Sequence, residues 1–292
     1  MPFKQIFLTV FLAMGISACA SFGTPNTPTP SVPSATPEPP TPTPPPSAAV
    51  VNGEYITIAE FEAELARFKA AQTALGQTFT DEDAKNIVLE DMIAQVLLSQ
   101  AARQENFIVS DADLQSRIDA LTAQVGGVEA FNQWLSANGY NETSFRVALK
   151  KSIEAAWMRY NIIAAVPASM EQIHLRQILT YNEADAQAAL QELNAGADFD
   201  ELAALYDAVT RGELGWVPQG YLLNADADAA VFALQAGEVS GIIRTEAGFH
   251  IFKAVERGEH ALSPDALLAM QELALRTWIA ARRETSEVVF TP

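Results

Sequence analysis

Few side chains of this chain could form or break covalent bonds. Its 292 residues include one cysteine, Cys19, and three histidines, which excludes an internal disulfide and a zinc-finger pattern. The sequence also has no glycine-rich phosphate loop, nucleophile elbow or HExxH motif. Asp226, Asp228 and Glu238 could suggest a cation site, but no dense run of oxygen ligands surrounds them. The sequence therefore predicts neither a metal site nor a cofactor.

Cys19 ends a short apolar segment near the start of the chain. Lys4 precedes the run Ile6–Met14, which is shorter than the roughly 20 residues of a membrane-spanning helix. The segment is typical of an export signal, and its final residues Ile-Ser-Ala-Cys resemble a bacterial lipobox, in which the cysteine is acylated. We therefore expect a lipoprotein signal peptide over 1–18 and a lipid on Cys19 that binds a membrane. An ordinary cleaved signal with an incidental cysteine is the alternative.

Composition divides the remaining chain into a stalk and a globular body. Of 16 prolines, 11 lie between Pro25 and Pro46, and proline at this density favours extended polyproline II. We interpret residues 19–48 as a lipid-anchored linker, with partner recognition by the proline tract as the alternative. Hydrophobic residues, 49% of the chain, suffice for a sizeable core. The net charge of −18 argues against nucleic-acid binding, because phosphate contacts need clustered Lys and Arg.

Residues 49–169 have mostly helical periodicity. They open with Val50–Ile56, which predicts a short strand with an Asn-Gly turn. No motif of catalytic residues follows, so we interpret this part as a helical domain whose grooves could bind unfolded chains. Its helices are predicted to begin at capping residues followed by apolar positions at helical spacing, namely Thr57, Thr80, Ser110 and Asn141.

The periodicity changes near Met170. Residues 171–180 alternate as a strand does, and two helices are predicted after them. A strand near 212–217, a helical turn at 231–234 and two strands at 242–245 and 249–255 complete the order β-α-α-β-turn-β-β. A last amphipathic helix is predicted to begin at Ser263-Pro264, and its apolar positions need a partner surface.

This ordered set resembles the parvulin rotamase domain, a peptidyl-prolyl cis-trans isomerase. The helical part before it and the last helix after it look like the extracytoplasmic foldases of the PrsA and SurA type, in which the C-terminal helix packs back on the helical domain. The resemblance implies an α+β fold, with a SurA-like domain over 49–169 completed by 259–292 and an antiparallel-sheet rotamase domain over 170–258. The matching segments are QIL (177–179), GADFDELA (196–203), GELGW (212–216) and FALQAGEVSGIIRTEAGFHIFKA (232–254).

The resemblance also implies two catalytic positions. His250, in GFHIF, occupies the place of the family's second active-site histidine. Gln177, in RQIL, stands where the family's first histidine would be. His174 cannot replace it, because a side chain three residues earlier on a strand points to the opposite face. A buried strand histidine without a direct role is the alternative reading of His250.

The same resemblance implies an apolar proline slot. Leu214 and Leu223 match its apolar positions, and Phe249 and Trp216 are expected to be further substrate contacts. The aromatic floor of the slot falls on Ala227, a much smaller side chain. Prolyl isomerisation needs no nucleophile, because the enzyme has only to bind the twisted amide better than either planar form.

Two functions are therefore predicted. In the first, the chain is a lipid-anchored, extracytoplasmic isomerase that acts on X-Pro bonds of unfolded exported polypeptides. In the second, its rotamase domain is catalytically weakened and the chain acts mainly as a binding chaperone. Gln177, Ala227 and Ala247 depart from the family pattern and favour weak catalysis.

Overall fold

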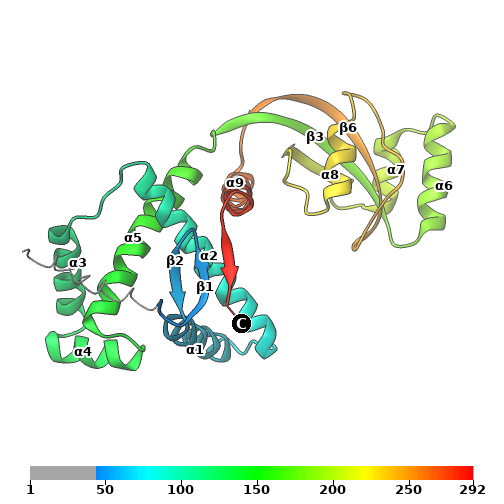
Figure 1. The fold of residues 1–292 in the computed structure, drawn as a ribbon. Helices are drawn as coiled ribbons and strands as arrows, with labels where there is room; N and C mark the ends of the chain where they lie inside the picture. The colour runs from blue at the N-terminus through cyan, green and yellow to red at the C-terminus, as the bar shows by residue number, and fades with distance from the viewer. Residues whose placement is uncertain (1–43, 292) are drawn as a thin grey trace, which may run out of the picture. The chain divides into compact units, whose positions relative to one another are not determined.

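The computed structural model describes residues 44–291. The predicted signal peptide, Cys19 and nearly all of the proline-rich segment lie outside these described residues. Within them the chain has nine helices and two antiparallel sheets, which confirms the α+β fold class. Residues 45–292 form one unit, in which a short hairpin and five helices precede the larger sheet along the chain (Figure 1). No helix of the described part is both long and apolar enough to cross a membrane.

The small sheet joins the two ends of the described chain. Strands β1 (Ser47–Val51) and β2 (Glu54–Thr57) form a hairpin. Asn52 and Gly53 connect them with φ values of 50° and 83°, as a tight type I′ turn requires. Strand β7 (Val288–Phe290) pairs with the other edge of β1. Periodicity does not predict β7, because three residues are too few to show alternation.

Five helices follow the hairpin. Their side-chain N-caps explain where four of them begin, because each predicted capping residue accepts a hydrogen bond from a backbone N–H of the first turn. The fourth helix begins after a glycine without a side-chain cap. The five helices are α1 (Ile58–Ala74), α2 (Asp81–Gln104), α3 (Asp111–Gln124), α4 (Val128–Ala137) and α5 (Glu142–Ala164).

The last helix, α9 (Pro264–Glu284), contacts two parts of the structure. Its Leu275, Trp278 and Ile279 pack against a buried cluster from α2 and α5. Nearer its start, Leu273 approaches the turn that follows strand β4 (Glu213–Pro218). A Cβ on Gly220 in this turn would lie only 2.5 Å from Leu273 Cδ2. The amphipathic surface predicted for this helix is thus covered in part, while Leu268 near its start is 57% exposed.

The larger sheet has the order β4-β3-β6-β5 and is antiparallel throughout. The central pair is longer than the sequence predicts, because residues 256–261 continue the second strand and pair back to Ser169. Its strands are β3 (Ser169–Thr180), β4 (Glu213–Pro218), β5 (Ile243–Thr245) and β6 (Gly248–Ala261), and its helices are α6 (Glu183–Asn194), α7 (Phe199–Tyr206) and α8 (Ala225–Phe232).

Each face of this sheet has its own core. On one face, Leu175 and Phe252 pack with Ala227 and Val231 of α8. On the other, Ile178 and Ile251 pack against α6 and α7, and Figure 1 shows these two helices together. Alternation along β3 places Gln177 on the α8 face and His174 on the α6/α7 face. The sheet therefore separates the polar groups of the two faces.

Candidate active site

A pocket of about 880 Å³ opens on the α8 face of the sheet. At its base, Ala227 and Phe252 are each 3% exposed and His250 is 8% exposed. Its rim is open, because Leu223 is fully exposed and Leu268 is 57% exposed. The apolar lining comes from β4, the segment after it, α8, β6 and α9, through Leu214, Tyr221, Leu222, Leu223, Ala227, Phe252 and Leu268.

Two polar side chains, Gln177 and His250, are hydrogen-bonded to each other in this pocket. Gln177 Oε1 lies 3.0 Å from His250 Nδ1 and accepts a hydrogen bond from the Nδ1–H group. On the other side of the ring, His250 Nε2 lies 2.8 Å from the Thr245 hydroxyl. That hydroxyl oxygen accepts the Ala247 N–H at 3.1 Å, so its own proton is free to point at His250 Nε2. The chain of bonds fixes one neutral tautomer of the ring.

Burial lowers the pKa of His250 below its ordinary value of 6.5. The two hydrogen bonds agree with this direction, since a neutral imidazole donates at one nitrogen and accepts at the other. The ring of His250 also stacks on Phe252 with centroids 5.3 Å apart and planes 8° apart. His250 is therefore held in its neutral form and fixed in orientation.

Pairing of neighbouring strands brings these groups together. His250 on β6 pairs with Leu179 of β3 and Ile243 of β5, while Phe252 pairs with Gln177. At the start of β4, Gly212 O accepts the Gln177 N–H at 2.7 Å. Gly212 is so close to β3 that a Cβ there would lie 2.0 Å from the Gln177 carbonyl oxygen. Only glycine fits at this crossing.

Replacing Gly212 with alanine is expected to destabilise the sheet by about 3 kcal/mol or more, since it adds a steric overlap to an unfavourable backbone conformation. The matched control is Gly215→Ala, because Gly215 has a φ of +75° close to the +74° of Gly212 but open space around its Cβ. We expect the control to cost only about 1 kcal/mol. Denaturant unfolding measures both, and equal losses would contradict the close approach.

A contact between Asp228 and Gly220 holds the segment that carries Leu222 and Leu223. Both carboxylate oxygens of Asp228 accept the Gly220 N–H, at 2.9 and 3.0 Å. Asp228 is 8% exposed, so this carboxylate stabilises a turn.

Among residues 44–291 no cluster of three or more His, Cys, Asp or Glu side chains could hold a metal ion.

The structure gathers some of the predicted site residues and separates others. Leu214 and Leu223 line the pocket together with Gln177 and His250. Phe249 is not among the lining residues and lies under the Arg244 guanidinium, 5.9 Å from the ring centroid. Trp216 also lies elsewhere, stacked on His260 with centroids 3.5 Å apart. Its neighbour Val217 packs in the α8-face core, and successive strand side chains point to opposite faces.

Sequence reasoning missed Tyr221, Leu222 and Leu268 as lining residues. The first two lie in a segment without regular periodicity, where no sequence pattern says which way a side chain points. Leu268 belongs to α9, and its place at the pocket follows only from tertiary packing.

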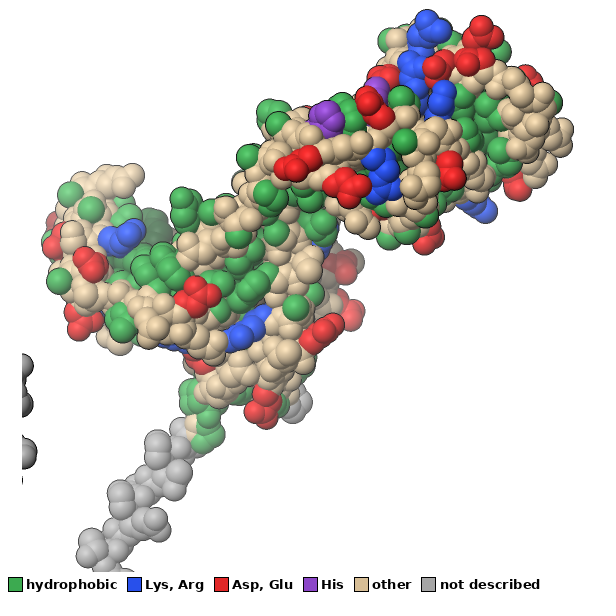
Figure 2. Space-filling view, turned by 90° about the horizontal axis from the view of Figure 1, so that it is seen from above, with side chains coloured by type: hydrophobic (Ala, Val, Ile, Leu, Met, Phe, Trp, Pro, Cys, Tyr) green, Lys and Arg blue, Asp and Glu red, His purple; other side chains and the backbone are tan. Residues whose placement is uncertain are grey.

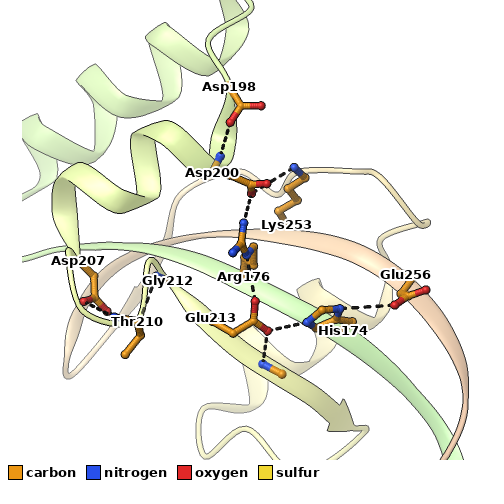
Figure 3. A network of polar contacts seen from close by, with 11 residues as sticks. His174, Arg176, Asp198, Asp200, Asp207, Thr210, Gly212, Glu213, Lys253 and Glu256 are labelled. Carbon is orange, nitrogen blue, oxygen red and sulfur yellow. Dashed lines mark hydrogen bonds and ion pairs between the residues drawn. The ribbon is translucent and has the colours of Figure 1, made fainter.

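The opposite face of the sheet carries a network of ion pairs (Figure 3). Arg176 bonds Asp200 at 2.6 Å and Glu213 at 3.0 Å, and His174 bonds Glu213 at 2.5 Å. Burial alone would raise the pKa of Glu213, but hydrogen bonds from His174 and Arg176 outweigh it and lower the pKa. These contacts tie β3, β4 and α7 together. The network is therefore structural support for the sheet behind the pocket.

The loop between α7 and β4 is closed by its own contacts. Asp207 Oδ1 accepts the backbone N–H groups of Val209 and Thr210, and its other oxygen bonds the Thr210 hydroxyl. Hydrogen bonds from Thr210 lower the pKa of this carboxyl group. Asp207 is not among the residues that line the pocket.

Comparison with known proteins finds similarity over both parts of the chain. Residues 3–159 match the model of the SurA-like N-terminal domain, and residues 176–256 match the PPIC-type PPIASE domain. The chain is 29% identical to "Foldase protein PrsA" of Caldanaerobacter subterraneus subsp. tengcongensis, over 70% of this chain and 72% of that protein. It is 27% identical to "Chaperone SurA" of Nitrosococcus oceani, over 72% of this chain and 58% of that protein. The pocket lies within the second matched region, apart from its α9 wall.

Proposed function

This chain belongs to the family that joins a SurA-like N-terminal domain to a PPIC-type peptidyl-prolyl isomerase domain, and we propose that it isomerises X-Pro bonds in the pocket around Gln177 and His250. It is a foldase by this membership, and its substrates are unfolded polypeptides. The observation that carries the assignment of the site is the Gln177–His250 hydrogen bond in an otherwise apolar, open pocket.

The pocket suits a reaction in which the amide only has to twist. An apolar lining removes water from the proline ring of the substrate. The X-Pro amide loses its resonance as it rotates, which gives a barrier of about 18–20 kcal/mol. The prolyl nitrogen then gains basicity. Gln177 Oε1 accepts the hydrogen bond from His250 Nδ1, which orients the side-chain amide of Gln177. The Nε2 group of Gln177 then remains available as a donor. We assign Gln177 Nε2 as the donor to the twisted amide and His250 as the group that orients it.

A second function, binding of unfolded chains, is favoured by a groove in the helical part. It is lined by residues of α2, α5 and α9, including Met92, Leu98, Ala155, Leu275 and Ile279. Apolar side chains also gather on the face of the helical part drawn in Figure 2. Such surfaces can hold apolar segments of a client. Because this groove shares no side chain with the pocket except Glu272, holding and isomerisation are expected to be separable.

His250→Ala tests this division of labour. We expect isomerisation of an X-Pro peptide to fall about tenfold, because Gln177 loses the partner that orients it. Protection of an unfolded client against aggregation is expected to stay unchanged, since His250 is not among the residues that line the groove. The reverse pattern, with protection lost and isomerisation intact, would contradict the proposal. His260→Ala is the matched control, because His260 lies outside the pocket.

The proposal places the chain outside the cytoplasm, anchored by a lipid on Cys19. It rests on the export-type segment and on the Ile-Ser-Ala-Cys sequence. Cys19→Ala is expected to leave precursor of full length or to release the protein from membranes. Membrane fractionation with intact-mass measurement decides this, and Ser17→Ala, which keeps the cysteine, is the control. Unchanged mass and unchanged membrane association in Cys19→Ala would exclude the lipid.

A further inference from the structure

The pocket carries charge of one sign at its opening. Three acidic side chains are among its lining residues, Glu246 from the β5–β6 turn and Asp265 and Glu272 from α9. All three are exposed, whereas the base of the pocket is apolar and buried. No lysine or arginine lines the pocket. We call Glu246, Asp265 and Glu272 the acidic rim.

The acidic rim has no neutralising partner in the described part of the chain. None of its carboxylates takes part in an ion pair within residues 44–291, whereas four acids of or beside the larger sheet do, namely Glu171, Asp200, Glu213 and Glu256. Arg244 lies two residues before Glu246 and Arg276 lies four residues after Glu272, and neither lines the pocket. Arg244 lies over the Phe249 ring instead. The rim therefore presents to whatever enters three carboxylates that have no ion-pair partner within residues 44–291.

We infer that the acidic rim selects the substrate: the pocket prefers X-Pro segments with lysine or arginine beside the proline and disfavours segments with acidic or phosphorylated residues there. This inference rests on the proposed function and adds its substrate class. The proline fills the apolar base, and its neighbours in the peptide then lie at the height of the rim. There, a cation is attracted and an anion repelled, as for any charged-walled cleft.

The size of the effect follows from the exposure of the rim. Exposed charges a few ångströms apart interact only weakly in water. Two or three such interactions, weakened by distance, correspond to about a tenfold preference. The preference is also expected to vanish near 1 M salt, where the Debye length is only about 3 Å. A preference that arises from shape would not respond to salt in this way.

A set of matched peptides tests the inference on the full chain. Three peptides differ only in the residues on both sides of one proline, which are lysine, leucine or glutamate. A fourth carries the same two lysines several residues away from a leucine-flanked proline, which controls for the negative charge of the whole chain. We expect kcat/KM for isomerisation to be about tenfold higher with flanking lysine than with flanking glutamate. The distant-lysine peptide is expected to match the leucine peptide.

Variants then assign the preference to the rim. Glu246→Gln with Glu272→Gln is expected to reduce the lysine-to-glutamate ratio from about ten to about two. Glu192→Gln removes an acid of α6 outside the pocket and is expected to leave the ratio at about ten. A ratio near one in the unmodified chain, or an equal drop in Glu192→Gln, would overturn the inference.

The failure of this inference is distinguishable from the failure of the proposed function. If the leucine peptide is isomerised but flanking charge has no effect, only the acidic rim is wrong. If no peptide is isomerised above the uncatalysed rate, the proposed function fails. In that case the dissociation constants of the same peptides, measured by NMR titration, still decide the inference: a tenfold tighter lysine peptide supports it and equal constants overturn it.

Discussion

Replacing Gln177 with leucine is expected to lower kcat/KM for X-Pro isomerisation by ten- to a hundredfold while the fold remains intact. Leucine has nearly the same volume, but it removes both the acceptor of the His250 Nδ1 proton and the free Nε2 donor. Removing one partner of such a hydrogen bond and leaving the other unpaired costs about 1–3 kcal/mol. Each increase of about 1.4 kcal/mol in the activation barrier slows the reaction about tenfold. A coupled or NMR-detected peptide assay measures the loss.

Two companion variants show which atom of Gln177 matters. Gln177→Glu keeps an acceptor for His250 but has no N–H to offer a substrate. If the donor acts on the twisted amide, this variant is as slow as Gln177→Leu. Full activity in Gln177→Glu would show that position 177 only orients His250. Gln187→Leu, the same change on the exposed surface of α6, is the control.

Deleting residues 262–292 is expected to unfold the helical part and to spare the larger sheet. The deletion removes β7 from the small sheet and takes Leu275, Trp278 and Ile279 from the cluster on α2 and α5. Loss of a single large core side chain typically costs about 2–5 kcal/mol. Several such losses equal the whole stability of a typical domain, about 5–15 kcal/mol. The larger sheet loses the contact of α9 with the segment around Gly220 and the α9 wall of the pocket, but no residue of its two buried cores.

Hydrogen exchange followed residue by residue separates the two parts. In the deletion variant we expect amides of α2 and α5 to lose protection and amides of β3 and β6 to keep it. A milder variant, Trp278→Ala with Ile279→Ala, keeps β7 and is expected to destabilise the same helices by a smaller amount. Leu268→Ala removes an exposed apolar side chain from the same helix and serves as control. Equal loss of protection in both parts would show that α9 is not specific to the helical part.

Local signals predicted much of the fold. Thr57, Thr80, Ser110 and Asn141 each cap the helix that follows, as their residue types and spacing indicate. These contacts lie within a few residues, so the sequence contains all the information needed. Strand β3 was also predictable from the alternation around Ile173 and Leu175, which enter one core, while Ile178 enters the core on the other face. Helix α8 begins earlier than predicted, at Ala225, because Asn224 caps a run of alanines and aspartates that shows no apolar periodicity.

The site was predictable only in part, for reasons of distance along the chain. Gln177 and His250 lie 73 residues apart and meet through strand pairing, which the family resemblance implied. The acidic residues of α9 meet the pocket only through packing of a helix far away in sequence. The directions of Phe249 and Trp216 depend on strand register, and a shift of one residue changes the face on which a side chain lies.

The most direct test of the account is an NMR exchange measurement on a peptide with one leucine-flanked proline and a catalytic amount of the full chain. The account predicts accelerated cis-trans exchange, together with chemical-shift changes at Gln177, His250 and Phe252 when the peptide is added in excess. The acceleration should shrink at least tenfold in Gln177→Leu. Unaccelerated exchange, or acceleration that Gln177→Leu leaves unchanged, would contradict the assignment of this pocket as the isomerase site.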